Sequence, residues 1–228
     1  MKPFNDKNGL NIKHQTTMNI FFIDFETTGL SPYTDDIIEI AVKKIDSDDY
    51  FETFVTPKKM PKGSLYTYVP PHIVKITGIT DKMINENGII KSVAIQNMFD
   101  FIVKGSDKDK PIYIVAHNGV AFDFIFFRKY IYEYLETVCI GIDKKIFENI
   151  KYIDTILIAK SYPNKFNKLS QPYLCNKYNI INEDEHRALG DVKALEKLYK
   201  GLCIDFAKSK GEKENHYLEN PQDIKLYI

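Results

Sequence analysis

The sequence has no excess of charge of either sign. Its 228 residues include 31 basic and 31 acidic side chains, so the formal net charge at pH 7 is zero. A protein that packages nucleic acid non-specifically normally carries a strong positive charge, and the balance argues mildly against that class. It argues less against an enzyme with clustered carboxylates, because bound cations would restore a positive charge locally.

Cysteines are also few, and long hydrophobic runs are absent. The three cysteines, Cys139, Cys175 and Cys203, are widely spaced and show no metal-type pairing. We therefore expect reduced, buried thiols in an intracellular protein of the cytoplasm or nucleus. No apolar stretch approaches the roughly 18 residues that a membrane span needs, and the N-terminus is polar. We expect neither a membrane anchor nor a secretory signal.

The chain is rich enough in hydrophobic residues, at 44%, to form the full core of one domain. A loose polar arm is expected at residues 1–17, the domain at 18–208 and a polar tail without regular structure at 209–228. Apolar patterns predict strands within 21–30 and at 37–42, 50–55, 112–115 and 152–157. Helices are predicted at 70–76, 92–103, 121–135, 169–178 and 187–207. This order predicts an α/β fold with a mixed five-stranded sheet flanked by helices.

Two carboxylates lie in the densest apolar segment, Phe-Ile-Asp-Phe-Glu at residues 22–26. Successive strand residues point to opposite faces, so Asp24 and Glu26 share one face. Two such charges about 4 Å apart repel by roughly 4 kcal/mol at an effective dielectric constant near 20. A divalent cation between them would remove that repulsion. In the structural alternative, one carboxylate caps the following turn and the other reaches solvent.

A third carboxylate, Asp123, lies among the phenylalanines of His-Asn-Gly-Val-Ala-Phe-Asp-Phe-Ile-Phe-Phe, residues 117–127. An unpaired carboxylate in such surroundings is strongly disfavoured. Asp123 would also be stabilised in the first turn of a helix, by the helix dipole and the free amides. This segment alone leaves a functional and a structural aspartate as equal alternatives.

Asp191 gives the strongest signal. In the last predicted helix, apolar residues at helical spacing should face the sheet: Ala188, Val192, Leu195, Leu198 and Leu202. Asp191 lies within this stripe, whereas a solvated aspartate belongs on the opposite, lysine-rich face. His186 lies one turn earlier, where a lone histidine is usually a capping or surface group. We keep that interpretation for the other four histidines, His14, His72, His117 and His216.

Together the three segments bring four carboxylates into the interior, with His186 close by. Oxygen ligands in this number suit Mg²⁺ or Mn²⁺ and do not suit zinc, which prefers cysteine and more histidine. Two such ions about 3.5–4 Å apart stabilise the attacking and leaving oxygens of a phosphodiester. A histidine with a pKa near neutrality can take the proton of an attacking water.

In these segments the chain resembles the DEDDh 3′–5′ exonucleases, a family that includes the epsilon proofreading subunit of DNA polymerase III, Trex-type exonucleases, RNase T and oligoribonuclease. Phe-Ile-Asp-Phe-Glu-Thr-Thr-Gly-Leu is similar to the first motif, His-Asn-Gly with Phe-Asp-Phe to the second and His-x-x-x-x-Asp to the third. The spacing of His186 and Asp191 favours this branch over the sister branch that uses a tyrosine. The resemblance covers residues 19–207 and implies an RNase H-like sheet.

The resemblance also implies roles for individual residues. The ligands of two divalent metal ions, Mg²⁺ or Mn²⁺, would be Asp24, Glu26, Asp123 and Asp191. The general base would be His186. The residues that would contact the 3′-terminal nucleotides are Thr27, Gly29, Leu30, Ile79 and Phe122. Leu30 would lie under the last base, although Leu30 and Phe122 can also be explained as core residues.

The activity implied is hydrolysis at the 3′ end of single-stranded or frayed nucleic acid, releasing nucleoside 5′-monophosphates. Thr-Thr-Gly after Glu26 is more similar to the epsilon and Trex groups than to oligoribonuclease, so the resemblance favours DNA as substrate, in repair or proofreading. We find no clamp-binding peptide of the epsilon type in the tail, so a polymerase partner has no support in the sequence.

Three alternatives differ from this hypothesis. An exoribonuclease that trims RNA 3′ ends would use the same residues and contact a 2′-hydroxyl. An inactive nucleic-acid-binding module should have lost one or more of the five catalytic residues, and none is missing. A structural Ca²⁺-binding protein would need a compact ligand loop, whereas these ligands are dispersed along the chain.

Overall fold

The computed structural model describes residues 18–57, 69–137, 145–162, 165–182 and 184–225, so the predicted arm at 1–17 and Cys139 lie outside the described residues. A six-stranded sheet with the order β4-β3-β2-β1-β5-β6 forms its centre. The strands are β1 (Ile20–Thr27), β2 (Ile37–Lys44), β3 (Tyr50–Thr56), β4 (Ile89–Ile90), β5 (Ile112–Ala116) and β6 (Ile150–Asp154). Consecutive strands β1 to β3 are antiparallel, and β5 and β6 run parallel to β1. The predicted mixed α/β sheet is confirmed, with one strand more than predicted, because two residues are too few to show alternation.

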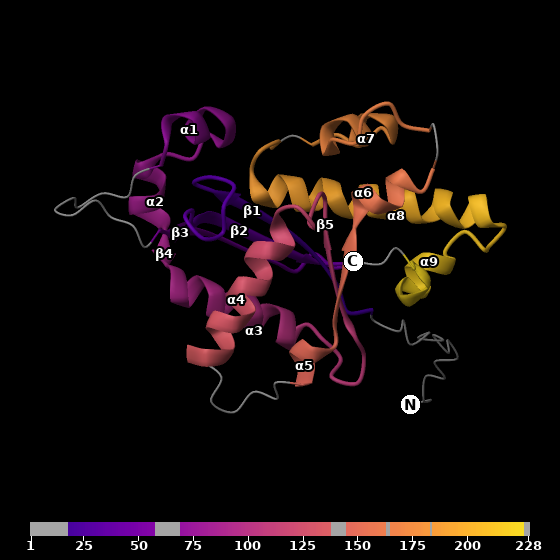
Figure 1. The fold of residues 1–228 in the computed structure, drawn as a ribbon, viewed down its shortest axis with the longest axis horizontal. Helices are drawn as coiled ribbons and strands as arrows, with labels where there is room; N and C mark the ends of the chain where they lie inside the picture. The colour runs from indigo at the N-terminus through magenta and orange to yellow at the C-terminus, as the bar shows by residue number, and fades with distance from the viewer. Residues whose placement is uncertain (1–17, 58–68, 138–144, 163–164, 183, 226–228) are drawn as a thin grey trace, which may run out of the picture.

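Helices cover both faces of this sheet (Figure 1). They are α1 (Pro71–Thr77), α2 (Asp81–Asn87), α3 (Lys91–Lys104), α4 (Asp123–Thr137), α5 (Lys145–Glu148), α6 (Thr155–Lys160), α7 (Gln171–Lys177), α8 (Ala188–Lys210) and α9 (His216–Glu219), followed by the 3₁₀ turn η1 (Pro221–Asp223). In Figure 1, α3 and α4 lie on one side of the sheet and α8 lies on the other. None of the described helices is both long and apolar enough to cross a membrane.

Successive side chains of β1 point to opposite faces of the sheet and pack in two separate hydrophobic cores. Phe21, Ile23 and Phe25 pack in the core that α3 and α4 share with the sheet. Ile20 and Phe22 pack in the core beneath α8, where the predicted apolar stripe of that helix is buried. Asp24 and Glu26 continue the face of Ile20 and Phe22, so β1 aims both carboxylates toward the start of α8.

The prediction that the last strand extends over residues 152–157 was wrong for its second half. β6 ends at Asp154, and α6 begins at Thr155. The Asp154 carboxylate accepts the Ile156 N–H at 2.9 Å and so caps α6. It also accepts the N–H groups of Asn118 at 3.0 Å and Val120 at 3.1 Å, which fixes the loop that leads to α4. A short apolar run does not distinguish a strand from a buried helix by periodicity alone.

The tail that we expected to lack regular structure folds back on α8. That helix continues to Lys210 and ends at Gly211, which has a φ of 74° that favours glycine. α9 follows, and its residue Tyr217 is buried with its ring centroid 4.7 Å from that of Phe206. The segment holds too few apolar residues to show a period in the sequence.

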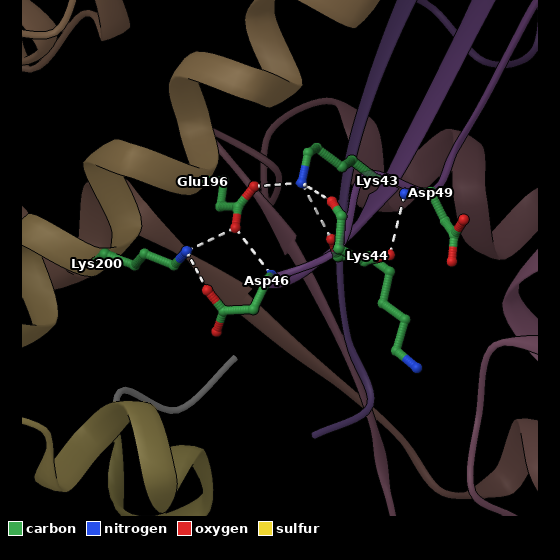
Figure 2. Close-up of polar contacts among 7 residues, drawn as sticks. Lys43, Lys44, Asp46, Asp49, Glu196 and Lys200 are labelled. Carbon is green, nitrogen blue, oxygen red and sulfur yellow. Dashed lines mark hydrogen bonds and ion pairs between the residues drawn. The ribbon is translucent and has the colours of Figure 1, made fainter. Parts of the chain in front are cut away.

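A buried ion cluster links α8 to the carboxyl end of β2 (Figure 2). Glu196 of α8 lies 2.6 Å from Lys43 Nζ and 2.7 Å from Lys200 Nζ, and it accepts the Asp46 N–H at 3.0 Å. Burial alone would raise the pKa of Glu196, but the hydrogen bonds from Lys200 and Lys43 outweigh it and lower the pKa. The cluster therefore holds an ionised carboxylate between the helix and the sheet.

Removal of this carboxylate is expected to destabilise the fold. Glu196→Ala leaves Lys43, whose side chain is 12% exposed, without an ionic partner and should lower the free energy of unfolding by about 3 kcal/mol. Urea unfolding at pH 7 measures the change. The control is Glu214→Ala, which removes an exposed partner of Lys208 and should leave the midpoint where it is. Equal midpoints for both variants would contradict this account of the cluster.

Candidate active site

Three carboxylates meet where β1 ends against the first turn of α8. Asp24, Glu26 and Asp191 each offer an oxygen, and these oxygens lie within 4.8 Å of one another. Asp123 begins α4 and is 3% exposed. Its Oδ1 is buried and has no hydrogen-bond partner among the described residues. A hydrogen bond from the Phe25 N–H lowers the pKa of the Asp123 carboxylate. Asp123 therefore lies beside β1, the strand that carries Asp24 and Glu26.

Burial is the largest cause of a raised pKa in all four carboxylates. It raises the pKa of Glu26 to about 8, that of Asp123 to about 7 and that of Asp191 to about 6. Burial also raises the pKa of Asp24 well above its usual value, and the charges of Asp123, Glu26 and Asp191 raise it further. As anions these groups repel one another, so the cluster favours bound protons or bound cations.

Hydrogen bonds fix the orientation of the Asp191 carboxylate. Its Oδ1 accepts from Asn182 Nδ2 at 2.8 Å and from Gln171 Nε2 at 3.3 Å. Its Oδ2 accepts the main-chain N–H of His186 at 3.1 Å. Three donors from separate segments therefore hold the carboxylate in one position.

His186 lies at the rim of the cluster. Its φ is 65°, a left-handed conformation that turns the chain so that its N–H points to Asp191. The side chain is 52% exposed, and its Nε2 lies 3.7 Å from a Glu185 carboxylate oxygen. The ring is therefore open to solvent beside the carboxylates, as a group that exchanges protons with water must be.

The loop after β1 presents Leu30 to solvent. Leu30 is 82% exposed, which excludes the alternative that it belongs to the core. The Thr27 hydroxyl is buried and donates to the Gly29 carbonyl. A side chain at Gly29 would place its Cβ 2.5 Å from the Asp35 carboxylate, so a larger residue there would require the Asp35 side chain to move.

The other two predicted base contacts differ from each other. Phe122 is half-buried, with its ring centroid 5.1 Å from that of Phe126, so part of the ring remains accessible. Ile79 is fully buried in a small cluster with Ile38, Val69 and Ile84. The side chain of Ile79 is covered in this conformation, and its contact with a base stays a prediction. The segment around it packs locally, which a motif match does not show.

His117 is partly buried and has partners at both ring nitrogens, although we interpreted it as a capping or surface group. Its Nδ1 lies 2.8 Å from Thr155 Oγ1 and its Nε2 lies 2.7 Å from the Leu169 carbonyl oxygen. Burial lowers the pKa of His117, so the ring is neutral at pH 7. It links the loop after β5 to the segment before α7 and has a structural role.

Sequence reasoning missed an ion pair beside the cluster. Glu39 of β2 is fully buried and accepts two hydrogen bonds on Oε1 from Arg187, at 2.6 Å from Nη2 and 3.1 Å from Nε. The only signal in the sequence is a carboxylate inside the apolar run Ile-Ile-Glu-Ile-Ala-Val at residues 37–42. Its partner is 148 residues further along the chain.

The donor set fits a divalent cation. Asp123 has a buried oxygen with no hydrogen-bond partner within the described ranges, and the neighbouring carboxylates converge within 4.8 Å. The group contains neither sulfur nor imidazole ligands, which suits Mg²⁺ or Mn²⁺. A mixed α/β sheet with such carboxylates from β1, α4 and α8 is the arrangement that the resemblance to RNase H-like nucleases implies.

A family model agrees with this class. The model described as an exonuclease family, of the RNase T type, matches residues 21–199. The chain therefore belongs to the DEDD-type 3′–5′ exonuclease family of the RNase H-like superfamily.

Curated relatives are similar over most of this chain. A PolC-type DNA polymerase III of Clostridium perfringens is 31% identical over 196 residues, which are 85% of this chain and 12% of the polymerase. The exonuclease DPD1 of Arabidopsis thaliana, chloroplastic and mitochondrial, is 29% identical over 205 residues, 84% of this chain and 58% of that protein. The chain thus spans about an eighth of the PolC-type relative and less than two thirds of DPD1.

Solved structures share the fold. Exonuclease I of Escherichia coli, in a zinc-bound complex with single-stranded DNA, matches with a TM-score of 0.62 and 18% identity, covering 89% of this chain and 43% of that chain. The same enzyme with a dT13 oligonucleotide matches with a TM-score of 0.61 and 18% identity, covering 84% of this chain and 42% of that chain. At this identity the match establishes the RNase H-like fold.

Proposed function

We propose that the chain is a 3′–5′ exonuclease that uses two divalent cations, Mg²⁺ or Mn²⁺, at the 3′ ends of single-stranded or frayed DNA and releases nucleoside 5′-monophosphates. The observation that carries the proposal is the convergence of Asp24, Glu26 and Asp191, with Asp123 nearby and all four pKa values raised, in a member of the exonuclease family. Repulsion among these carboxylates is relieved when cations bind.

The four carboxylates would hold the two cations. When bound, these cations supply a more acidic water and a positive charge beside the scissile phosphate. Asp24 and Glu26 come from a central strand, and Asp191 is held by three hydrogen bonds, so little reorganisation is needed on binding.

His186 would accept the proton of the attacking water. The exposed ring can reach a water at the rim, and the Glu185 carboxylate 3.7 Å away stabilises the charged imidazole that forms. Leu30 would support the last base, since an apolar side chain that is 82% exposed offers a contact surface. Thr27 and Gly29 would shape the loop that presents Leu30, and Phe122 would contribute its accessible edge.

The His186→Ala variant is expected to lower kcat about 100-fold, because a positioned general base contributes roughly that much. Its affinity for Mn²⁺ should change less than about twofold, since only the main-chain N–H of His186 contacts Asp191. Single-turnover cleavage and calorimetric titration with Mn²⁺ measure the two quantities. His216→Ala, which alters a histidine paired with Asp223, is the control. Unchanged turnover in His186→Ala would remove this residue from the mechanism.

DNA is favoured over RNA by the names of the relatives. The curated relatives include DNA polymerases, and exonuclease I was solved with single-stranded DNA. Degradation rates of DNA and RNA oligonucleotides of one sequence test the preference. Faster degradation of DNA supports the proposal, and faster degradation of RNA would assign the chain to RNA 3′-end trimming instead.

The proposal also includes the residue bounds of the catalytic domain and a candidate partner protein. We place the catalytic unit at residues 18–208, with the segment to residue 225 packed against α8. The PolC-type relatives contain a matching segment within a much longer polymerase, which makes a polymerase a candidate partner. An inactive binding module is the competing class, and the presence of all five residues that we propose as catalytic disfavours it.

A further inference from the structure

We propose that Glu39 and Arg187 are positioning residues that fix the start of α8, and with it His186 and Asp191, against the strand that carries Glu26. The kinetic part of this inference rests on the proposed function. The structural part rests on the contacts of Glu39 alone.

Glu39 caps α8 from a distant strand. The residue at the N-cap position of α8, Arg187, makes no side-chain capping hydrogen bond. The Ala188 N–H instead donates to Glu39 Oε2 at 2.9 Å. A carboxylate at this position satisfies a free amide and interacts well with the helix dipole.

The same carboxylate holds the guanidinium of Arg187. Oε1 accepts from Nη2 at 2.6 Å and from Nε at 3.1 Å, and Oε2 lies 3.3 Å from Nε. Charge-assisted bonds of this geometry are strong and directional. Arg187 directly follows His186, so the residue after His186 is tied to one buried side chain of β2 by its own side chain and by the main-chain N–H that follows it.

Glu39 also lies on the strand next to the one that carries Glu26. Its Cα pairs with that of Glu26 in the antiparallel β1–β2 register, so the two side chains share a face. The capping carboxylate therefore sets the distance between the residue that supplies Glu26 and the helix that supplies Asp191. A small shift of α8 would open the cluster in which these oxygens lie within 4.8 Å.

Stability does not explain a carboxylate at this place. Glu39 is fully buried beside Glu26 and adds charge to a cluster that already repels. A well-packed apolar residue is often at least as stabilising as a buried ion pair. The guanidinium itself is fixed, with Phe54 beneath it at 5.1 Å and Glu52 at 4.0 Å. Its Nε and Nη2 groups both donate to Glu39, which is consistent with a supporting role for Arg187 beside the site.

The test compares Glu39→Gln with Glu52→Gln. Glu39→Gln keeps the side-chain shape and should lower kcat and Mn²⁺ affinity each about tenfold, with KM for a DNA oligonucleotide within about twofold. Hydrogen exchange of the first-turn amides of α8 should accelerate in the metal-free protein. Glu52→Gln alters the other carboxylate near Arg187 and should change none of these. Arg187→Lys, which keeps the charge and loses the two-donor geometry, should behave like Glu39→Gln.

Two results would overturn the proposal. Normal kcat, Mn²⁺ affinity and exchange in Glu39→Gln, with only a lower melting temperature, would make the pair a structural bond. A higher KM with normal kcat in Arg187→Lys would make Arg187 a substrate contact. If the wild-type protein degrades no nucleic acid, the proposed function fails, whereas exchange and Mn²⁺ affinity still decide whether Glu39 positions α8.

Discussion

The Asp24→Asn variant is expected to lose about a thousandfold or more of its nuclease activity, because it removes a charged metal ligand at the centre of the cluster. The metal-free variant should at the same time be more stable than the wild type. Burial and then the charges of Asp123, Glu26 and Asp191 oppose ionisation of Asp24, so the folded protein must either bury this charge or take up a proton, and the neutral amide avoids both costs. We expect a gain of about 1–2 kcal/mol, which raises the melting temperature by about 2–8 °C.

Cleavage rates and thermal melts in EDTA measure the two effects. Asp49→Asn is the matched control, because it changes an exposed aspartate in the turn after β2 and should alter neither quantity. A variant that keeps its activity would exclude Asp24 from the metal site. A variant that fails to fold would show that the carboxylate is structural.

Divalent metal should stabilise the protein more at about pH 8 than at about pH 6. The pKa values of Asp191, Asp123 and Glu26, at about 6, 7 and 8, lie above the ordinary range near 4. In this window the folded, metal-free protein binds more protons than the unfolded chain, so these groups lower its stability as pH rises. Metal binding requires the ionised carboxylates, and its affinity rises over the same window.

Melting temperatures measured with excess Mg²⁺ and with EDTA, across this pH range, test the linkage. The difference between the two curves should widen from pH 6 to pH 8 and should be smaller in Asp24→Asn. Activity should be lost in EDTA and return with added Mg²⁺. An equal difference at both pH values would mean that the raised pKa values do not belong to the groups that bind metal.

The sequence identified the carboxylates because each interrupts an apolar pattern. Asp24 and Glu26 fall in a buried strand, Asp123 among phenylalanines and Asp191 in the apolar stripe of a helix. The structure brings these four side chains to the same end of the sheet. A carboxylate inside an apolar pattern was the informative signal, clearest for Asp191 in its helical stripe, whereas the segment around Asp123 alone left a structural aspartate as an equal alternative.

Contacts between distant segments could not be predicted in this way. Glu39 looked like one polar residue in a strand, and its function as a cap depends on Arg187 and Ala188, which tertiary folding brings near. Ile79 matched a family-like segment, but local packing buries it. The apolar run after Asp154 became a helix because the aspartate caps it. Each outcome depends on a partner that the local pattern does not contain.

The most direct test of the central claim is digestion of a 5′-labelled single-stranded DNA with Mg²⁺, with Mn²⁺ and with EDTA, beside the Asp24→Asn variant. The account predicts a ladder that shortens from the 3′ end with either metal, nucleoside 5′-monophosphates as products, and no cleavage in EDTA or by the variant. An intact substrate with folded wild-type protein and metal, or cleavage that persists in EDTA, would contradict it.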